Sequence, residues 1–141
     1  MNNRDLHYLL LVSQYLCNRR IVSRTNKLEL LPGQPKILEF LLEHDGCSQK
    51  EIGEGCLLDK STVTSLIPRM EGLELIAKHP DPEDGRVFRI SLTPKGRRLA
   101  SMVRGIVSET DRLAWKGIKD DEREAFILTM QKIIENLKEA L

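Results

Sequence analysis

The run of short elements between residues 48 and 96 is the feature that most constrains the fold. Ser48-Gln49-Lys50-Glu51 is a capping box, in which a serine and a glutamate each satisfy an amide at a helix start. A second helix is expected after Asp59, a residue type that suits an N-cap, and should continue to about residue 71 or 72. Only a turn at Leu57-Leu58 separates the two helices. This spacing is typical of a helix-turn-helix, which holds its second helix in a DNA groove.

A β-hairpin is predicted directly after these helices. Residues 75–79 and 86–92 are the expected strands, because proline, aspartate and glycine between them supply turn chemistry. Thr93 as a cap and Pro94 in the first turn then begin a long helix. A hairpin in this position is the wing of a winged helix. The chain is therefore predicted to be mainly α with a small β-hairpin wing.

Helices with apolar stripes are predicted on both sides of this region. One covers residues 4–24, and another begins near Pro32-Gly33-Gln34-Pro35 and stops at Gly46. The helix that starts at Thr93 is expected to break at residues 119–122, before a last helix. The stripe of that last helix is too wide for one neighbour, which predicts a homodimer paired through the first and last helices. Packing of three helices within one chain is the alternative. The stripe contains Phe126, Ile127, Met130, Ile133, Ile134, Leu137 and Leu141.

Bulk charge does not indicate a nucleic-acid partner. The chain has 22 basic and 21 acidic residues, and residues 45–100 hold nine of each. A phosphate-binding surface must therefore come from the arrangement of charges, with basic groups gathered on one face. A winged helix that only docks other proteins stays open as an alternative. Scarce aromatic residues, 4% of the chain, argue against stacking on single-stranded nucleic acid.

Several features predict a cytoplasmic location. No apolar run approaches the roughly 20 residues of a membrane helix, so no membrane partner is expected. Polar residues 2–5 and the lack of a small-residue cleavage site do not resemble a secretory signal. Three cysteines, an odd number, do not suggest a disulfide framework.

An ordered set of segments resembles the MarR family of winged-helix transcription regulators. The likeness covers nearly the whole chain and is strongest between residues 34 and 96. The matching segments include Ser48-Gln49-Lys50-Glu51-Ile52, Lys60-Ser61-Thr62-Val63-Thr64, Arg69-Met70-Glu71, Asp81-Pro82-Glu83-Asp84-Gly85-Arg86 and Leu92-Thr93-Pro94-Lys95-Gly96. The resemblance implies one domain over residues 1–141, with a DNA-binding region at 31–98 and dimerisation helices at 1–30 and 99–141. It also implies a homodimeric repressor that binds a pseudo-palindromic site on double-stranded DNA. A small-molecule effector or another signal would release the DNA.

Carried onto this sequence, the resemblance gives a set of DNA-binding residues. Short hydroxyl side chains at the start of the second helix suit phosphates and base edges, and a lysine beside them adds charge at a helix end. In the wing, Arg86 matches an arginine that enters the minor groove, and Asp84 can hold it by an ion pair. Lys95, Arg97 and Arg98 are weaker candidates for backbone contact. The DNA-binding residues are Lys60, Ser61, Thr62, Thr64, Ser65, Arg69, Asp84, Arg86 and Arg89.

Two residues depart from the family pattern. Pro68 falls inside the second helix of the helix-turn-helix, the predicted recognition helix. Proline there removes the hydrogen bond to the Thr64 carbonyl and costs about 3 kcal/mol. A kink or an early loosening beyond Ile67 is therefore expected. The family tends to place glycine just before the first wing strand, where this chain has Glu74. The helix is accordingly expected to end earlier or in a different turn.

Other chemistries have weaker signals. Cys17 on the first helix is a candidate redox sensor, since some relatives place a reactive thiol there and activate it by tyrosines from the partner. Here Tyr8 and Tyr15 precede Cys17 on the same helix and no tyrosine follows it, so a buried, inert thiol is favoured. His44, Cys47 and Cys56 have part of the spacing of a zinc site, but a fourth ligand is not evident, and a structural role is favoured. Scattered histidines and the lack of a nucleophile elbow, phosphate loop or carboxylate pair argue against an enzyme. No cofactor or metal is expected.

Overall fold

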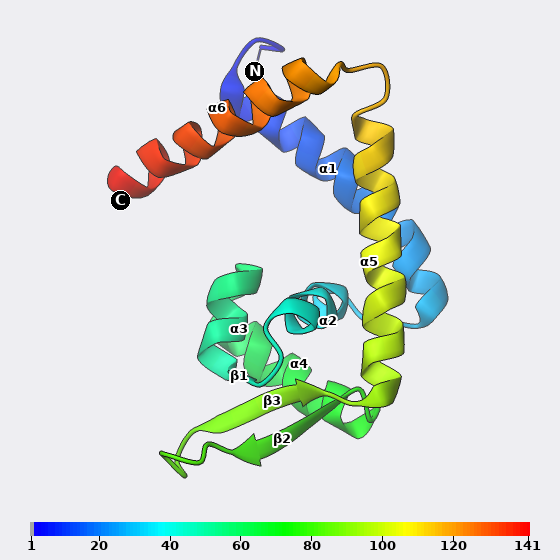
Figure 1. Ribbon diagram of the computed structural model, residues 1–141, viewed down its shortest axis with the longest axis vertical. Helices are drawn as coiled ribbons and strands as arrows, with labels where there is room; N and C mark the ends of the chain where they lie inside the picture. The colour runs from blue at the N-terminus through cyan, green and yellow to red at the C-terminus, as the bar shows by residue number, and fades with distance from the viewer. Residues whose placement is uncertain (1) are drawn as a thin grey trace. The chain divides into compact units, whose positions relative to one another are not determined.

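The computed structural model describes residues 2–141, which divide into a first unit up to residue 108 and a second unit from residue 109. The fold is mainly helical with a small sheet, so the predicted fold class is confirmed (Figure 1). In chain order the elements are α1 (Leu6–Thr25), a 3-10 turn (Asn26–Leu28), α2 (Gln34–Glu43), β1 (Cys47–Ser48), α3 (Gln49–Cys56), α4 (Lys60–Gly72), β2 (Ile76–Pro80), β3 (Phe88–Leu92), α5 (Pro94–Ala114) and α6 (Asp120–Glu139).

The sheet has three antiparallel strands in the order β1-β3-β2. The hairpin of β2 and β3 was predicted, but β1 was not. This strand of two residues pairs Cys47 with Ile90 and Ser48 with Arg89. The prediction that α2 continues to Gly46 was wrong, because the helix ends at Glu43. Gly46 does adopt a left-handed conformation (φ +77°), which directs the chain into β1.

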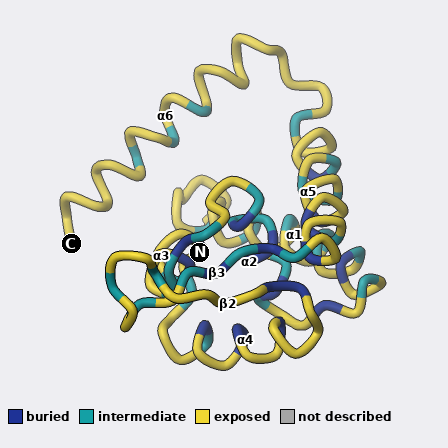
Figure 2. Tube along the Cα trace, turned by 60° about the horizontal axis from the view of Figure 1, so that its bottom comes forward, coloured by how far each residue is buried: buried dark blue, intermediate teal, exposed yellow. Residues whose placement is uncertain are grey.

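One apolar core lies under α2, α3, α4 and the sheet, as the dark segments in Figure 2 show. Apolar residues recur at helical spacing on α2 and α4, so each helix turns a single face inward. The base of α5 closes the core with Ala100 and Val103. The fully buried side chains include Ile37, Leu38, Leu41, Ile52, Ile67, Met70, Leu75 and Ile90.

The α4 helix does not end early at Pro68. It continues through Gly72, with proline inside it. Pro68 and Thr64 both lie on the exposed face, so the carbonyl that loses its amide partner can bond water instead. The predicted early loosening beyond Ile67 was therefore wrong, and the alternative of a kink at Pro68 stays a prediction.

The turn after α4 forms with glutamate in the position that favours glycine. Glu74 has a left-handed backbone (φ +59°). Its amide donates to the Glu71 carbonyl at 2.9 Å, and the Leu75 amide donates to the Met70 carbonyl at 3.0 Å. These two bonds are those of a Schellman motif, which satisfies the last carbonyls of a helix. The prediction that the helix ends earlier or in a different turn was therefore wrong, because Glu74 adopts the left-handed conformation that glycine usually supplies.

The start of α5 is bound to the end of α4. The Thr93 amide donates to the Leu75 carbonyl at 3.1 Å, and the Thr93 hydroxyl donates to the Glu74 carbonyl. The Lys95 ammonium donates to the Leu73 carbonyl at 2.9 Å. Gly96 lies so close that an added Cβ would overlap the Leu75 carbonyl oxygen. We call this set of contacts, from residues 73–75 to residues 93–96, the wing base.

In the second unit, the connection between α5 and α6 comes earlier than predicted. The prediction of a break at residues 119–122 was wrong, because α5 ends at Ala114 and Asp120 to Glu122 form the first turn of α6. Acidic side chains favour that position because they face the positive end of the helix dipole. Gly117 makes the turn with φ +80°.

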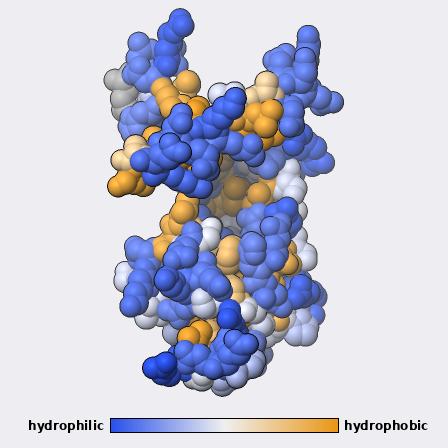
Figure 3. Space-filling view, turned by 60° about the vertical axis from the view of Figure 1, so that its left-hand side comes forward, coloured by the Kyte–Doolittle hydropathy of each residue, from blue (hydrophilic) through white to orange (hydrophobic). Residues whose placement is uncertain are grey.

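Apolar side chains of α1 and α6 are largely exposed in the isolated chain. Leu9 and Leu16 of α1 are 49% and 56% exposed, and Phe126 and Leu137 of α6 are 54% and 55% exposed. Figure 3 shows hydrophobic patches, in orange, on a mostly hydrophilic surface. Within residues 2–141, no helix has the length and apolar content needed to cross a bilayer.

Replacing Gly96 by alanine should lower the free energy of unfolding by about 3 kcal/mol, because the new methyl group must push the Leu75 carbonyl away. Gly105→Ala is the matched control in the same helix. An added Cβ there meets no heavy atom of the described chain within 4 Å, so this variant should gain about 1 kcal/mol from helix propensity. Urea denaturation followed by circular dichroism at one protein concentration measures both. Equal effects at the two sites would contradict the close packing of the wing base.

Candidate nucleic-acid interface

Asp59 organises the start of α4. Its carboxylate accepts from the Thr62 amide at 2.7 Å and from the Ser61 hydroxyl at 2.8 Å. The first bond is the N-cap expected from the sequence, and it satisfies an amide that has no partner inside the helix. The second bond fixes the Ser61 hydroxyl, whose hydrogen points at Asp59 and whose oxygen remains able to accept.

The predicted recognition residues share one face of α4. Lys60, Ser61, Thr64, Ser65 and Arg69 are exposed, and Thr62 is half-buried. The opposite face is buried through Val63, Leu66, Ile67 and Met70. The helix therefore has one face fixed in the core and one face with hydroxyl, lysine and arginine side chains available to a partner.

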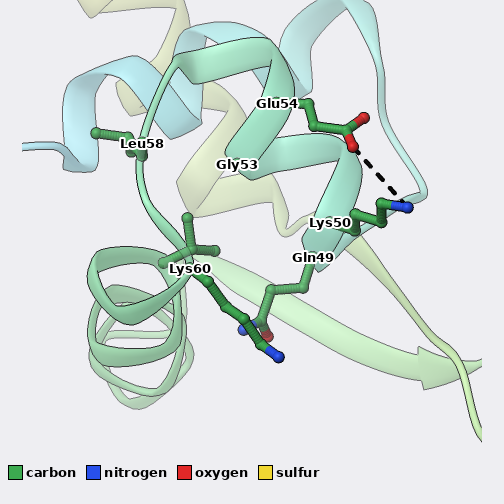
Figure 4. Close-up of a pocket in the computed structure, with 7 residues that line it drawn as sticks. Gln49, Lys50, Gly53, Glu54, Leu58 and Lys60 are labelled. Atoms are coloured by element: carbon green, nitrogen blue, oxygen red, sulfur yellow. Dashed lines mark ion pairs between the residues drawn. The ribbon is translucent and has the colours of Figure 1, made fainter.

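A groove of about 430 Å³ lies between α3 and α4 beside this face, as Figure 4 shows. Leu58 and Val63 are among its apolar lining residues, and Lys50 and Lys60 also line it. Gln49, which the sequence analysis did not single out, extends from the start of α3 and donates to the Thr64 hydroxyl oxygen at 3.1 Å. The only available sequence signal was its place inside the capping box.

The wing tip is built around two aspartates. Asp81 accepts from the amides of Glu83 and Asp84 at 2.8 and 3.1 Å, which closes the turn. Asp84 accepts from the Arg86 guanidinium at 3.3 Å, so the expected ion pair is present. The Arg86 side chain is 92% exposed at the tip, where it can reach a partner.

Three other predicted basic contacts, Arg89, Lys95 and Arg97, are already engaged within the chain. Arg89 donates to Asp81 at 2.6 Å and to Glu51 at 3.5 Å, which ties the wing to the capping box of α3. Arg97 donates to Asp45 at 3.1 Å, and Lys95 belongs to the wing base. These side chains have structural partners that the sequence did not reveal.

Three carboxylates of this region, those of Glu51, Asp59 and Asp81, have lowered pKa values. Hydrogen bonds, chiefly from the Thr62 amide, lower the pKa of Asp59 below its ordinary value. The Arg89 guanidinium is the main cause that lowers the pKa of Asp81, and the amide of its capping-box serine lowers that of Glu51. All three therefore keep their charge and their structural bonds well below neutral pH.

Comparison with known proteins shows the family to which the chain belongs. A family model described as MarR family matches residues 29–87. YsmB, an uncharacterized HTH-type transcriptional regulator of Bacillus subtilis (strain 168), is 32% identical over 113 residues, covering 80% of this chain and 77% of that protein. The chain belongs to the MarR family. Its winged helix-turn-helix is that of a DNA-binding transcriptional regulator, as the sequence predicted.

Solved structures of MarR-type regulators share the fold. A structure of the S. aureus MepR–DNA complex superposes with a TM-score of 0.84 at 21% identity, over 94% of this chain and 98% of that chain. Bordetella bronchiseptica BpsR, whose DNA binding is regulated by 6-hydroxynicotinic acid, superposes with a TM-score of 0.81 at 22% identity, over 94% and 95%.

In this MarR-family chain, Cys17 lines a cavity of about 220 Å³ in the first unit. The cavity lies among α1, the segment that leads into α2, and α5, with Val22, Leu30, Val103 and Val107 in its wall. Cys17 is half-buried. The tyrosines at positions 8 and 15 lie on the same helix, before the cysteine.

The remaining two cysteines, Cys47 and Cys56, are part of the apolar core. Burial raises the pKa of Cys47 and of Cys56 to about 11, so both are thiols at neutral pH. The Cys56 thiol donates to the Lys36 carbonyl at 3.5 Å. Among residues 2–141, His44 and these cysteines do not gather with another histidine, cysteine or carboxylate into a group that could hold a metal ion.

Acid should weaken the start of α4 in a defined pH window. The pKa of Asp59 is lower in the folded chain than in the unfolded chain, so its contribution is complete at neutral pH and is lost as pH falls below about 4. Asp59→Asn keeps a capping oxygen but cannot titrate. The stability difference between the two proteins, measured by urea denaturation from pH 7 to pH 3, should shift in favour of asparagine below pH 4. A difference that stays constant over this range would show that Asp59 does not titrate with folding.

Proposed function

We propose that this protein is a homodimeric repressor that binds a palindromic operator and leaves it when a small molecule occupies the cavity beside Cys17. The observation that carries the DNA-binding part is the exposed face of α4, with Lys60, Ser61, Thr64 and Ser65, next to a wing that presents Arg86. Such a helix and wing suit adjacent major and minor grooves. The MepR–DNA complex, which has the same fold, supports this use of the surface.

Residues divide by role within this proposal. Thr62, Thr64 and Ser65 contact base edges or phosphates in the major groove, and Lys60 and Arg69 contact phosphates. Arg86, held by Asp84, enters the minor groove. Arg89 acts mainly by fixing the wing, because its guanidinium already faces two carboxylates. The reader comprises residues 31–98, and the flanking segments form the dimer.

The exposed apolar side chains of α1 and α6 support the homodimer. Leu9, Leu16, Phe126 and Leu137 are each about half exposed in the single chain. Covering such side chains in a symmetric interface removes apolar surface from water, at about 25 cal/mol per Å². Two readers held about 34–36 Å apart would contact successive turns of one duplex.

The cavity supports an effector that is small and partly apolar. Its wall is mostly aliphatic, with Gln14 and Asn18 as polar groups able to orient a ligand. BpsR, with the same fold, is regulated by 6-hydroxynicotinic acid. A ligand bound here acts by favouring a dimer in which the spacing of the readers no longer fits DNA.

Selection of duplexes from a random pool should enrich a palindromic motif, and sedimentation should show a dimer on one duplex. Affinity should fall steeply as salt rises, because each phosphate contact displaces counterions. A monomer that binds no duplex, or binding without salt dependence, would leave only the protein-docking alternative.

Replacing Arg86 by alanine should weaken operator binding roughly ten- to hundredfold, because each half-site loses a charged contact in the groove. The fold should persist, since the Arg86 side chain is almost fully exposed. Lys27→Ala removes one exposed positive charge from the 3-10 turn after α1 and serves as the matched control. Fluorescence anisotropy with the selected duplex measures both variants. Equal affinities of the Arg86 and Lys27 variants would remove the wing from the mechanism.

A further inference from the structure

One side-chain hydrogen bond connects the two helices of the reader on the exposed face. Gln49, the first residue of α3, donates its side-chain amide to the Thr64 hydroxyl oxygen at 3.1 Å. Figure 4 shows the Gln49 side chain extending from α3 toward α4, beside Lys60. In the described chain, no other side-chain hydrogen bond joins α3 to α4. Gln49 therefore acts directly on a residue proposed to read DNA.

This bond decides which hydrogen-bonding group Thr64 presents to solvent. A hydroxyl has one hydrogen to donate and two lone pairs that can accept. The Gln49 amide occupies a lone pair, so the hydrogen is left over. Helical hydroxyls often donate to the carbonyl four residues earlier, as Thr129 does to Ala125 at 2.9 Å. Thr64 makes no such bond to Lys60 in the described residues, so its hydrogen is free to point outward.

Ser61 presents the opposite group. Its hydrogen is donated to Asp59 at 2.8 Å, which leaves its oxygen to accept. Ser61 and Thr64 are three residues apart, a spacing that places them side by side on one face of a helix. Two neighbouring hydroxyls thus have different roles, each set by a different residue. The α4 surface carries a fixed acceptor next to a fixed donor.

We propose that Gln49 is a specificity-determining residue that acts by fixing Thr64 as a hydrogen-bond donor. Thr64 then recognises an acceptor on the base that it faces, such as guanine O6 or N7, adenine N7 or thymine O4. It discriminates against cytosine, which presents the N4 amino group as a donor. This inference rests on the proposed DNA-binding function, and it names a residue outside the recognition helix as part of the readout.

Gln49→Glu tests the proposal because a carboxylate can only accept. Glutamate takes the Thr64 hydrogen and leaves Thr64 as an acceptor, so the preference at one motif position should shift toward cytosine, which presents the N4 amino group as a donor. One reversed hydrogen bond predicts a change of roughly three- to tenfold in relative affinity at that position. Lys50→Gln is the matched control, because it changes the charge of the next α3 residue by the same amount. It should weaken binding to all sequences without changing the motif.

Thr64→Val completes the design. Valine has nearly the shape of threonine and lacks the hydroxyl, so this variant should lose the preference at the same motif position. Adding Gln49→Glu to Thr64→Val should then have no further effect at that position. Random-pool selection, followed by anisotropy on duplexes that differ at one base pair, measures all five proteins.

The outcomes separate the inference from the function on which it rests. A motif for the native protein that Gln49→Glu leaves unchanged, with only a uniform loss of affinity, would overturn the inference and leave the proposed function standing. A Gln49→Glu effect that persists without the Thr64 hydroxyl would also overturn it. If the native protein enriches no motif at all, the proposed function fails and the inference fails with it.

Discussion

The wing base is the contact on which the geometry of the reader depends. Three successive carbonyls, those of Leu73, Glu74 and Leu75, accept hydrogen bonds from Thr93 and Lys95. Each bond contributes only about 1 kcal/mol net. Their larger effect is geometric. They join the last turn of α4 to the first turn of α5. The strands β2 and β3 begin and end at this junction, where Ile76 pairs with Leu92, so the end of the recognition helix sets their register.

The acidic residues of the reader explain why a nearly neutral region can still bind DNA. Many of the acids between residues 45 and 100 are occupied in structural bonds. Asp45 accepts from the Leu92 amide and from Arg97, and Asp59 and Glu51 cap helices. Asp81 and Asp84 shape the wing tip. A count of charges cannot distinguish these carboxylates from free ones. The exposed side chains in the first half of α4 are hydroxyls and Lys60, with Arg69 further along, and the one exposed acid of the helix, Glu71, lies in its last turn. This distribution fits a surface that reads DNA by arrangement more than by net charge.

Local features of the fold could be predicted, whereas contacts between distant segments could not. The capping box, the Asp59 cap and the wing turn each depend on residues within about four positions, and the structure has all three. The β1 strand escaped prediction because two residues have no periodicity of their own and become a strand only by pairing with Ile90 and Arg89. The partner of Gln49 is 15 residues away, and Arg89 meets Glu51 across 38 residues. At Pro68 a local rule failed. Proline usually ends or loosens a helix, but α4 continues to Gly72 because the rest of its inner face is buried in the core.

Close packing between the cavity wall and α4 allows the proposed effector to influence DNA binding. Leu31, Pro32 and Gly33 line the cavity beside Cys17, and Gly33 also lies against the recognition helix. A Cβ added to Gly33 would lie 2.7 Å from the Leu66 side chain, which shows how little space separates the two segments. Packed interiors do not deform smoothly, so a ligand that changes the conformation of residues 31–33 must also change the support of Leu66. Leu66 is on the buried face of α4, directly behind the residues proposed to read bases. The cavity wall and the support of the recognition helix are therefore one segment, and no long chain of intermediates is needed to connect them.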